Sequence, residues 1–402
     1  MKIETFALER WMTTYETKVA YDIAESGICP MTTADLLGIM PAEERERTLA
    51  DLLNLPLGYS EAPGSLDLRS LLAATYENTG PEHILVTTGA IEANFLLLNV
   101  LLEPGDHVVA VEPAYQQLGA VARAIGCEVT PWRLRPETGF RYDLEELEGL
   151  ITSRTRLIVV NTPHNPTGAM LSDAELGRIY DLAVARGARL LSDEAYRWLE
   201  IPGGERLAAP IRNRGDAGIS VGTLSKPFGL PGLRIGWMAA PADLVAACWA
   251  MRDYVSLSPG KLNDALAVLA LRHRDRLVER TQSIVTQNLA TAEAWFAAHA
   301  DMVAWTPPRG GLLALLHYAL DIPSLELANR LAEEYSVMLA PGSAFGLEHT
   351  LRIGIGQAPL IFATGLERTA ACFADLRAAG VDLRPGADLA AAAPALVAGT
   401  SS

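Results

Sequence analysis

Five short runs of β-branched and other apolar residues recur between residues 83 and 226, and each ends in polar or small residues. They read HILVTTGA (83–90), HVVAVEPAY (107–115), RLIVVNTP (156–163), RLLSDEAY (189–196) and ISVGTLSK (219–226). Amphipathic stretches such as 91–102 and 173–187 separate them, and Ser172 precedes the second as an N-cap. This alternation is typical of βαβ units around a mostly parallel sheet. Because ligands bind at the carboxyl ends of such strands, the residues that end each run are candidate site residues.

The pattern changes after about residue 258, where an Ala- and Leu-rich helical region extends to about residue 299. Strand patterns then return at 310–318, 336–342 and 350–356. A chain of 402 residues exceeds what one core usually organises, so we expect a second, smaller α+β domain that the N-terminal segment completes. The expected parts are an N-terminal arm (1–50), a large domain (51–295), a C-terminal small domain (296–380) and a flexible tail (381–402).

Composition excludes several partners. Lys and Arg number 33 against 48 Asp and Glu, a net charge of −15, which argues against nucleic acid and anionic membranes. The first residues are charged and no apolar run is long enough to span a membrane, so we expect a cytoplasmic protein. Four isolated cysteines show no zinc-like spacing, so we expect reduced thiols and no metal.

Residues 220–237 read SVGTLSKPFGLPGLRIGW and contain the most informative chemistry. Lys226 follows an apolar strand, where a lysine that loses its proton easily forms a Schiff base with an aldehyde. Thr223, Ser225 and Arg234 offer the donors that a bound phosphate requires. From these residues alone, a polar loop with a solvated lysine is the favoured interpretation.

Polar residues also follow two other strands. Asp193 needs a cationic partner if it is buried, and a pyridinium nitrogen would serve. Tyr196 and Asn165 offer a phenol and an amide to a ring oxygen. Taken singly, an Asp after a strand is often a helix cap and an Asn-Pro pair often marks a turn.

Together, these residues occur in the order and spacing of the fold type I enzymes that use pyridoxal 5′-phosphate. The sequence resembles the class I/II aminotransferases, the aspartate aminotransferase superfamily, from about Tyr59 to about Gly354. The segments PHNPTG, SDEAY and LSK followed by GLRIGW carry the resemblance. It implies a three-layer α/β/α fold with a mostly parallel central sheet, plus a smaller α+β domain formed by both chain ends.

The resemblance also implies roles for individual residues. Lys226 is expected to hold the cofactor as an internal aldimine and to move the proton from the substrate Cα. Asp193 is expected to pair with the pyridine nitrogen, and Asn165 and Tyr196 with the ring's 3′-oxygen. Tyr115 would stack on the ring, and the phosphate would be held by Gly89, Ala90, Ile91, Thr223, Ser225 and Arg234.

Three further residues match family positions that bind or cover the substrate. Arg352, in TLRIGIG, matches the arginine that clamps the substrate carboxylate. Tyr59 matches a tyrosine that reaches the cofactor phosphate of the neighbouring subunit, which implies a homodimer with shared active sites. Gly27 lies in the expected closing loop over the substrate, and Asn165 is also expected to contact the substrate.

The expected reaction is transfer of an amino group from a small-molecule L-amino acid to a 2-oxo acid, in amino-acid metabolism or biosynthesis. The sequence also resembles the capreomycidine synthases, enzymes of the same fold that cyclise a hydroxylated arginine, so cyclase or lyase chemistry stays open. A non-catalytic regulator is a third alternative, although Lys226 is present. For the substrate side chain, Arg252 and Lys261 are candidates to line the entrance, and Glu25 is a candidate partner for a guanidinium.

Overall fold

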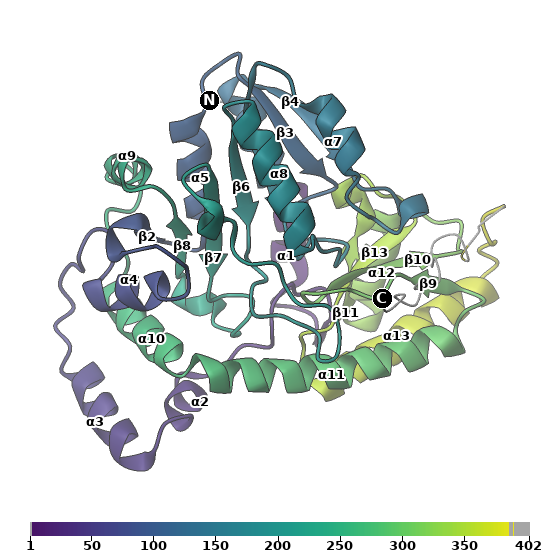
Figure 1. The fold of residues 1–402 in the computed structure, drawn as a ribbon. Helices are drawn as coiled ribbons and strands as arrows, with labels where there is room; N and C mark the ends of the chain where they lie inside the picture. Colours follow the sequence, from purple (N-terminus) through teal and green to yellow (C-terminus); the bar gives the residue numbers. More distant parts are fainter. Residues whose placement is uncertain (1, 386–388, 390–402) are drawn as a thin grey trace.

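The structure, a computed structural model, describes residues 2–385 and residue 389 (Figure 1). Within these residues the largest sheet has seven strands in the order β2-β8-β7-β6-β5-β3-β4. Only β8 runs antiparallel to its neighbours, so the prediction of a mostly parallel sheet is confirmed. The strands are β2 (Ile84–Thr87), β3 (His107–Glu112), β4 (Glu128–Arg133), β5 (Thr155–Asn161), β6 (Arg189–Asp193), β7 (Gly218–Thr223) and β8 (Gly236–Ala239).

The sequence analysis did not identify β4 or β8. β4 is an edge strand with only one buried residue and contains Pro131, which weakens the strand pattern. β8 has only four residues and follows directly on the loop after Lys226.

Helices cover both faces of this sheet and make the predicted three layers. Alternate residues of β3 separate the two interfaces: Val108 packs with one core cluster and Val109 with the other. Helices α5 (Ala90–Leu101), α6 (Gln117–Ile125) and α9 (Ala242–Arg252) pack on the first face, and α7 (Leu144–Leu150) and α8 (Asp173–Ala185) on the second. Ser172 caps α8 as expected, because its hydroxyl accepts from the Glu175 N–H while the Glu175 carboxylate accepts from the Ser172 N–H.

The expected helical region 258–299 contains two helices. These are α10 (Lys261–Arg272) and α11 (Arg274–Ala298), with His273 between them outside helical geometry at ψ 23°. Figure 1 shows α11 running from α10 past the large sheet to the smaller lobe. α4 (Leu66–Ala73) packs beside α10 on the large domain.

The smaller lobe contains residues from both ends of the chain, as predicted. Its four-stranded sheet has the order β12-β13-β10-β9 and antiparallel pairing. From the N-terminal side, β1 (Tyr21–Asp22) pairs with β11 (Val337–Met338), and α1 (Ala7–Tyr15) buries Leu8, Trp11 and Met12 in the same core. The other elements are β9 (Val303–Trp305), β10 (Leu313–Tyr318), α12 (Ser324–Tyr335), β12 (Ala340–Pro341), β13 (Thr350–Gly354) and α13 (Pro359–Ala378).

Two segments lie at the margins. Helices α2 (Thr33–Gly38) and α3 (Ala42–Leu53) connect the N-terminal arm to the large domain, and α3 has no buried residue. Of the expected tail, Leu383 bridges Leu320, and most of the remainder lies outside the described residues. Across the described residues, we find no helix with the length and hydropathy to cross a membrane.

Candidate active site

A cavity of about 440 Å³ opens at the carboxyl ends of β5, β6 and β7. The sheet brings together the side chains that follow these strands because parallel strands end at one edge. Thirteen of the predicted residues line this cavity, namely Glu25, Gly89, Ala90, Ile91, Tyr115, Asn165, Asp193, Tyr196, Thr223, Ser225, Lys226, Arg234 and Arg352.

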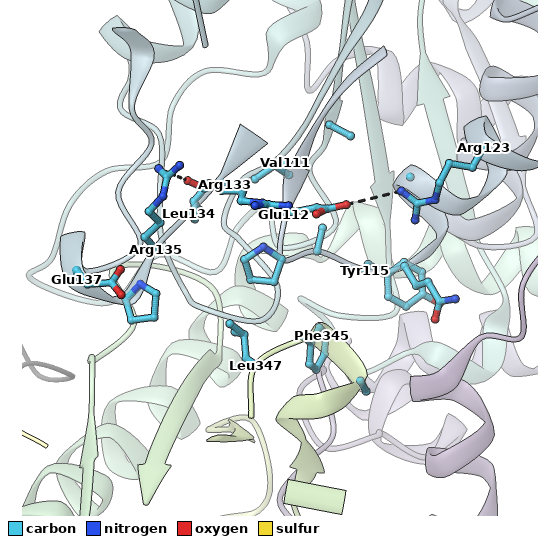
Figure 2. A pocket seen from close by; sticks show the side chains of 18 residues that line it. Val111, Glu112, Tyr115, Arg123, Arg133, Leu134, Arg135, Glu137, Phe345 and Leu347 are labelled. Carbon is cyan, nitrogen blue, oxygen red and sulfur yellow. Dashed lines mark hydrogen bonds and ion pairs between the residues drawn. The ribbon is translucent and has the colours of Figure 1, made fainter. Parts of the chain in front are cut away.

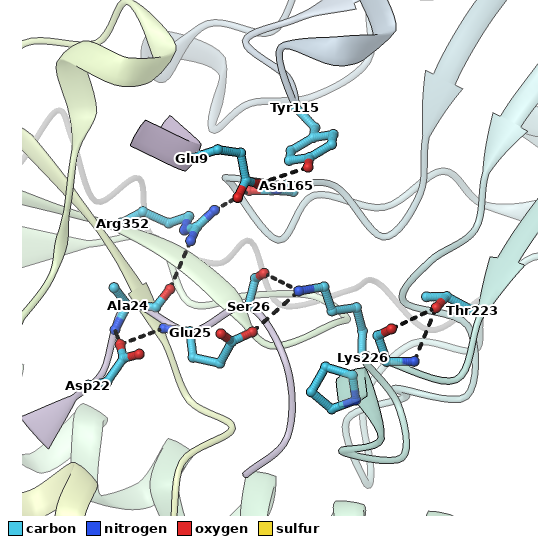
Figure 3. A network of polar contacts seen from close by, with 12 residues as sticks. Glu9, Asp22, Ala24, Glu25, Ser26, Tyr115, Asn165, Thr223, Lys226 and Arg352 are labelled. Carbon is cyan, nitrogen blue, oxygen red and sulfur yellow. Dashed lines mark hydrogen bonds and ion pairs between the residues drawn. The ribbon is translucent and has the colours of Figure 1, made fainter. Parts of the chain in front are cut away.

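Lys226 projects into the cavity toward the loop that follows β1 (Figure 3). Its Nζ donates to Ser26 Oγ at 2.7 Å and lies 3.3 Å from Glu25 Oε1. Burial lowers the pKa of Lys226, but the Glu25 carboxylate and the Tyr196 hydroxyl raise it by more, so the net pKa lies above the usual value. The expectation of an easily deprotonated lysine is therefore wrong for this arrangement, because the nearby carboxylate stabilises the ammonium ion.

Asp193 ends β6 as a buried carboxylate that faces the cavity. Burial raises its pKa, and hydrogen bonds from Asn94 Nδ2 (2.8 Å) and the Ala195 N–H (3.0 Å) oppose that shift. Sequence reasoning missed Asn94. Its signal is an amide within the apolar stretch IEANFLLL, where a buried polar group needs a partner.

Arg352 is 1% exposed and reaches the cavity from β13 of the small domain. Its Nη1 donates to Asn165 Oδ1 at 3.1 Å and its Nη2 to the Ala24 carbonyl at 2.8 Å (Figure 3). Its buried Nε has no hydrogen-bond partner within the described residues. Asn161 supports this arrangement, because its side chain accepts from the Asn165 N–H and donates to the Asp193 carbonyl. The site therefore joins both domains around an incompletely satisfied guanidinium.

The predicted phosphate cup consists of the amino end of α5 together with Thr223, Ser225 and Arg234, which line one part of the cavity. Gly89 has φ 82°, and a Cβ there would lie 2.7 Å from Arg234 Nη2, so this position requires glycine. The Gly89 N–H donates to the Thr87 carbonyl at 2.8 Å. Ala90 and Ile91 begin the helix and so have no intrahelical acceptor for their N–H groups. These two amides are the free backbone donors of the predicted cradle.

Helix α1 closes one side of the cavity, which the sequence did not reveal. The cavity is lined by Leu8, Glu9 and Met12 of this helix and by Glu16, which follows it. Tyr115 donates to Glu9 Oε1 at 2.8 Å (Figure 3). Burial, and then the Glu9 carboxylate, raise the pKa of Tyr115. Tyr115 also lines a second cavity of about 520 Å³ between the large domain and the segment Ala344–Leu347 (Figure 2).

Four predicted residues lie outside this cavity. Gly27 is adjacent, since a Cβ there would lie 3.6 Å from Lys226 Cδ. Tyr59 is 86% exposed on the loop after α3, so its predicted contact with a neighbouring subunit remains a prediction. Arg252 does not line the entrance: it is 0% exposed, and its guanidinium donates to the Ala62 and Val86 carbonyls. Lys261 faces another cavity, beside Tyr59, and is therefore not at the entrance either.

This fold and cavity define a pyridoxal-phosphate-dependent enzyme of the aminotransferase type. The chain belongs to the aminotransferase class I and II family, whose model matches residues 41–359. It is 36% identical to the capreomycidine synthase of Streptomyces vinaceus over 350 residues, covering 86% of this chain and 88% of that protein. It is 29% identical to the arginine–pyruvate transaminase of Pseudomonas aeruginosa over 353 residues, covering 84% and 87%.

Solved structures agree with this assignment. A pyridoxal-phosphate-dependent aminotransferase from Streptococcus suis superimposes with a TM-score of 0.88 at 33% identity, covering 96% of this chain and all of the other. The family implies pyridoxal 5′-phosphate as the cofactor. The cavity fits that group, because it offers an amine at Lys226, a buried carboxylate at Asp193 and a cup that a Cβ at Gly89 would fill.

Proposed function

We propose that this chain is an aminotransferase that moves the amino group of an L-amino acid to a 2-oxo acid. The observation that carries the proposal is that one cavity is lined by Asp193 at the end of β6, Lys226 on the loop after β7 and Arg352 within β13. Each offers a different chemistry there, namely an amine for covalent attachment, a carboxylate for a ring nitrogen and a guanidinium for a carboxylate. An enzyme of this class requires all three.

In this proposal the cofactor is attached at Lys226 and its phosphate lies in the cup at the start of α5. When bound, the cofactor supplies an electron sink that acidifies the Cα–H of an attached amino acid. Asp193 would keep the ring nitrogen protonated, and Asn165 and Tyr196 would hold the ring's 3′-oxygen. Tyr115 would pack against the ring.

Lys226 would then carry the Cα proton on its Nζ. Ser26 Oγ, at 2.7 Å, orients this amine, and Glu25, at 3.3 Å, stabilises its protonated form. Because Glu25 and Ser26 belong to the loop that contains Gly27, this loop both covers the amine and sets its charge. The unpaired Nε of Arg352 remains available to a substrate carboxylate.

The charges that line the cavity favour a substrate with a cationic side chain. The cations Lys226, Arg234 and Arg352 each have a role in binding cofactor or substrate carboxylate, which leaves the carboxylates of the N-terminal arm: Glu9, Glu16 and Glu25. Neither Glu9 nor Glu16 makes an ion pair with any described residue, whereas Glu25 pairs with Lys226. The similarity to an arginine–pyruvate transaminase supports the same substrate class.

We also propose a cytoplasmic homodimer with shared active sites. Several large apolar side chains are exposed at the end of α3 and on the loops after α3 and α9, namely Leu53, Leu57, Tyr59, Tyr254 and Val255. Exposed apolar patches often mark protein interfaces, and a second copy would cover this one. Four free cysteines are consistent with a reducing compartment.

The test is spectroscopic and then chemical. The purified protein should be yellow, and borohydride should fix the cofactor to Lys226 irreversibly. Product analysis over an amino-acid panel, including arginine and its hydroxylated forms, should yield a 2-oxo acid together with the aminated acceptor. Lys226→Ala should lose turnover by at least about 10²–10⁴-fold, since it removes the proton carrier. A colourless protein that does not respond to added pyridoxal 5′-phosphate would refute the proposal.

A cyclase is the second candidate, favoured by the 36% identity to capreomycidine synthase. The same panel separates the two functions. A cyclic guanidino amino acid formed from a hydroxylated arginine, without net amino transfer, would identify a cyclase.

A further inference from the structure

A buried pair of opposite charges lies beside the amino end of α5, outside the lining of the cavity. Arg252, the last residue of α9, is 0% exposed, and Glu92, in the first turn of α5, is 7% exposed. Arg252 Nε lies 3.9 Å from Glu92 Oε2. Removing two charges from water is costly, so a pair retained at this depth needs a structural or functional reason.

Ser256 hydrogen-bonds both members of the pair, and Glu92 also accepts from a backbone N–H group beside the cup. The Ser256 hydroxyl accepts from Arg252 Nε at 3.1 Å and donates to Glu92 Oε1 at 2.5 Å. The other carboxylate oxygen, Oε2, accepts the Thr88 N–H at 2.5 Å. Thr88 immediately precedes Gly89, the residue before α5, whose φ of 82° glycine adopts without strain.

Arg252 also fixes two neighbouring segments. Its Nη1 donates to the Val86 carbonyl at 2.6 Å, near the end of β2, and to the Ala62 carbonyl at 2.8 Å, on the loop that carries Tyr59. One guanidinium thereby ties the strand before the cup to the loop with the predicted inter-subunit tyrosine. Neither Arg252 nor Glu92 lines the candidate active site.

We propose that Arg252 and Glu92 are positioning residues for the cofactor phosphate, acting through the backbone of Thr88 and Gly89. This inference rests on the proposed function, which places the phosphate in the cup at the start of α5. The pair orients the Ala90 and Ile91 N–H groups, so its contribution depends on the phosphate and not on the pyridine ring or on Lys226.

Two probes separate phosphate positioning from general structural support: pyridoxal 5′-phosphate and pyridoxal, which lacks the phosphate. Their affinities for the cofactor-free full-length protein are measured by absorbance titration. In Glu92→Gln and Arg252→Lys, we expect pyridoxal 5′-phosphate to bind about 10- to 100-fold more weakly, the usual effect of losing a charged hydrogen bond. Pyridoxal affinity should change by less than about threefold, because its contacts are intact.

Ser256→Ala is the milder variant, since it removes the bridging hydroxyl and keeps both charges. It should lower the ratio of the affinity for pyridoxal 5′-phosphate to the affinity for pyridoxal by a smaller factor. It also keeps the test valid if either charge variant fails to fold. Arg212→Lys is the matched control, because Arg212 is also a buried arginine (6% exposed) paired with a carboxylate, Asp216, at 3.1 Å. The control should leave the ratio unchanged.

The outcomes are distinct. If the Glu92 and Ser256 variants leave the ratio of the two affinities unchanged, whether or not both affinities fall, the positioning role is overturned and the proposed function stays intact. A wild-type protein that binds both probes equally would overturn the placement of the phosphate itself, and with it this inference. A wild-type protein that binds neither pyridoxal 5′-phosphate nor pyridoxal would overturn this inference and the proposed function.

Discussion

The phenol of Tyr115 donates a 2.8 Å hydrogen bond to Glu9, which joins the large domain to helix α1 at the wall of the candidate active-site cavity. Helix α1 is anchored independently on the small domain, where Trp11 Nε1 donates to Asn329 Oδ1 at 2.8 Å. Glu9 is therefore held at a fixed position beside the space that a substrate side chain would occupy.

Replacing Glu9 by Gln should reduce the preference for cationic substrates. We expect kcat/KM for arginine or lysine to fall roughly 10- to 100-fold, the range for loss of a charge-assisted contact. Activity with a neutral amino acid should change by less than about threefold, because Gln still accepts from Tyr115. Glu4→Gln is the control. Glu4 lies on the same N-terminal segment as Glu9 and pairs with Arg123, but it does not line the cavity. An equal decline for both substrate types would show that Glu9 has no role in specificity.

Arg352→Lys should weaken substrate binding without weakening cofactor binding. Lysine keeps the charge but loses the planar fork that accommodates Asn165, Ala24 and a carboxylate together. Steady-state kinetics should show KM for the amino acid rising roughly 10- to 100-fold. Affinity for pyridoxal 5′-phosphate, measured by absorbance titration, should stay within about threefold of wild type. An unchanged KM would place the substrate carboxylate elsewhere.

Asn94→Ala should change the pH dependence of cofactor binding. The Asn94 amide lowers the pKa of Asp193 against the effect of burial, so its loss should raise that pKa further. Because pairing with a protonated ring nitrogen requires the ionised carboxylate, affinity should recover only at higher pH than in wild type. Asn99→Ala is the control on the same helix, since the Asn99 amide donates to the Phe95 carbonyl of its own helix and does not line the cavity. Superimposable pH profiles for Asn94→Ala and wild type would contradict this role.

The sequence predicted the strand-end residues well because one physical rule places them. Parallel strands end at one edge, so Asn165, Asp193 and Lys226 meet wherever the strands pair correctly. Arg352 and the α5 cup were predicted through the family resemblance. The resemblance indicated which residues far apart in the sequence lie together, and local sequence patterns do not contain that information.

Residues that reach the site from helices could not be predicted by this rule about strand ends. Glu9 is one of many exposed acids until α1 docks on the small domain, and Asn94 is one amide in an apolar helix. The burial of Arg252 could not be predicted, because a basic residue at the end of a helix is usually exposed. In each case, tertiary packing and not local periodicity decides the role.

The loop that carries Glu25 and Ser26 is held by Asp22, whose Oδ1 accepts from the Ala24 and Glu25 N–H groups at 2.9 and 3.0 Å. Burial, and then the nearby Glu25 carboxylate, raise the pKa of Asp22 from 3.8 to about 6. Between these two pH values the unfolded chain releases this proton before the folded protein does. The free energy of unfolding should therefore fall as pH rises from about 4 to about 6, by up to about 3 kcal/mol from this group.

Asp22→Asn should remove that part of the pH dependence, because the amide oxygen still accepts both N–H groups and carries no charge. Thermal unfolding should show a Tm difference, variant minus wild type, that grows between pH 4 and 6.5 and then stays constant. Asp35→Asn is the opposite control. Its hydrogen bonds with Thr32 lower the pKa of Asp35, so its stabilising contribution is lost as pH falls toward and below 4. A Tm difference for Asp22→Asn that is independent of pH would show that Asp22 does not titrate in this range, and that its carboxylate is as well solvated in the folded protein as in the unfolded chain.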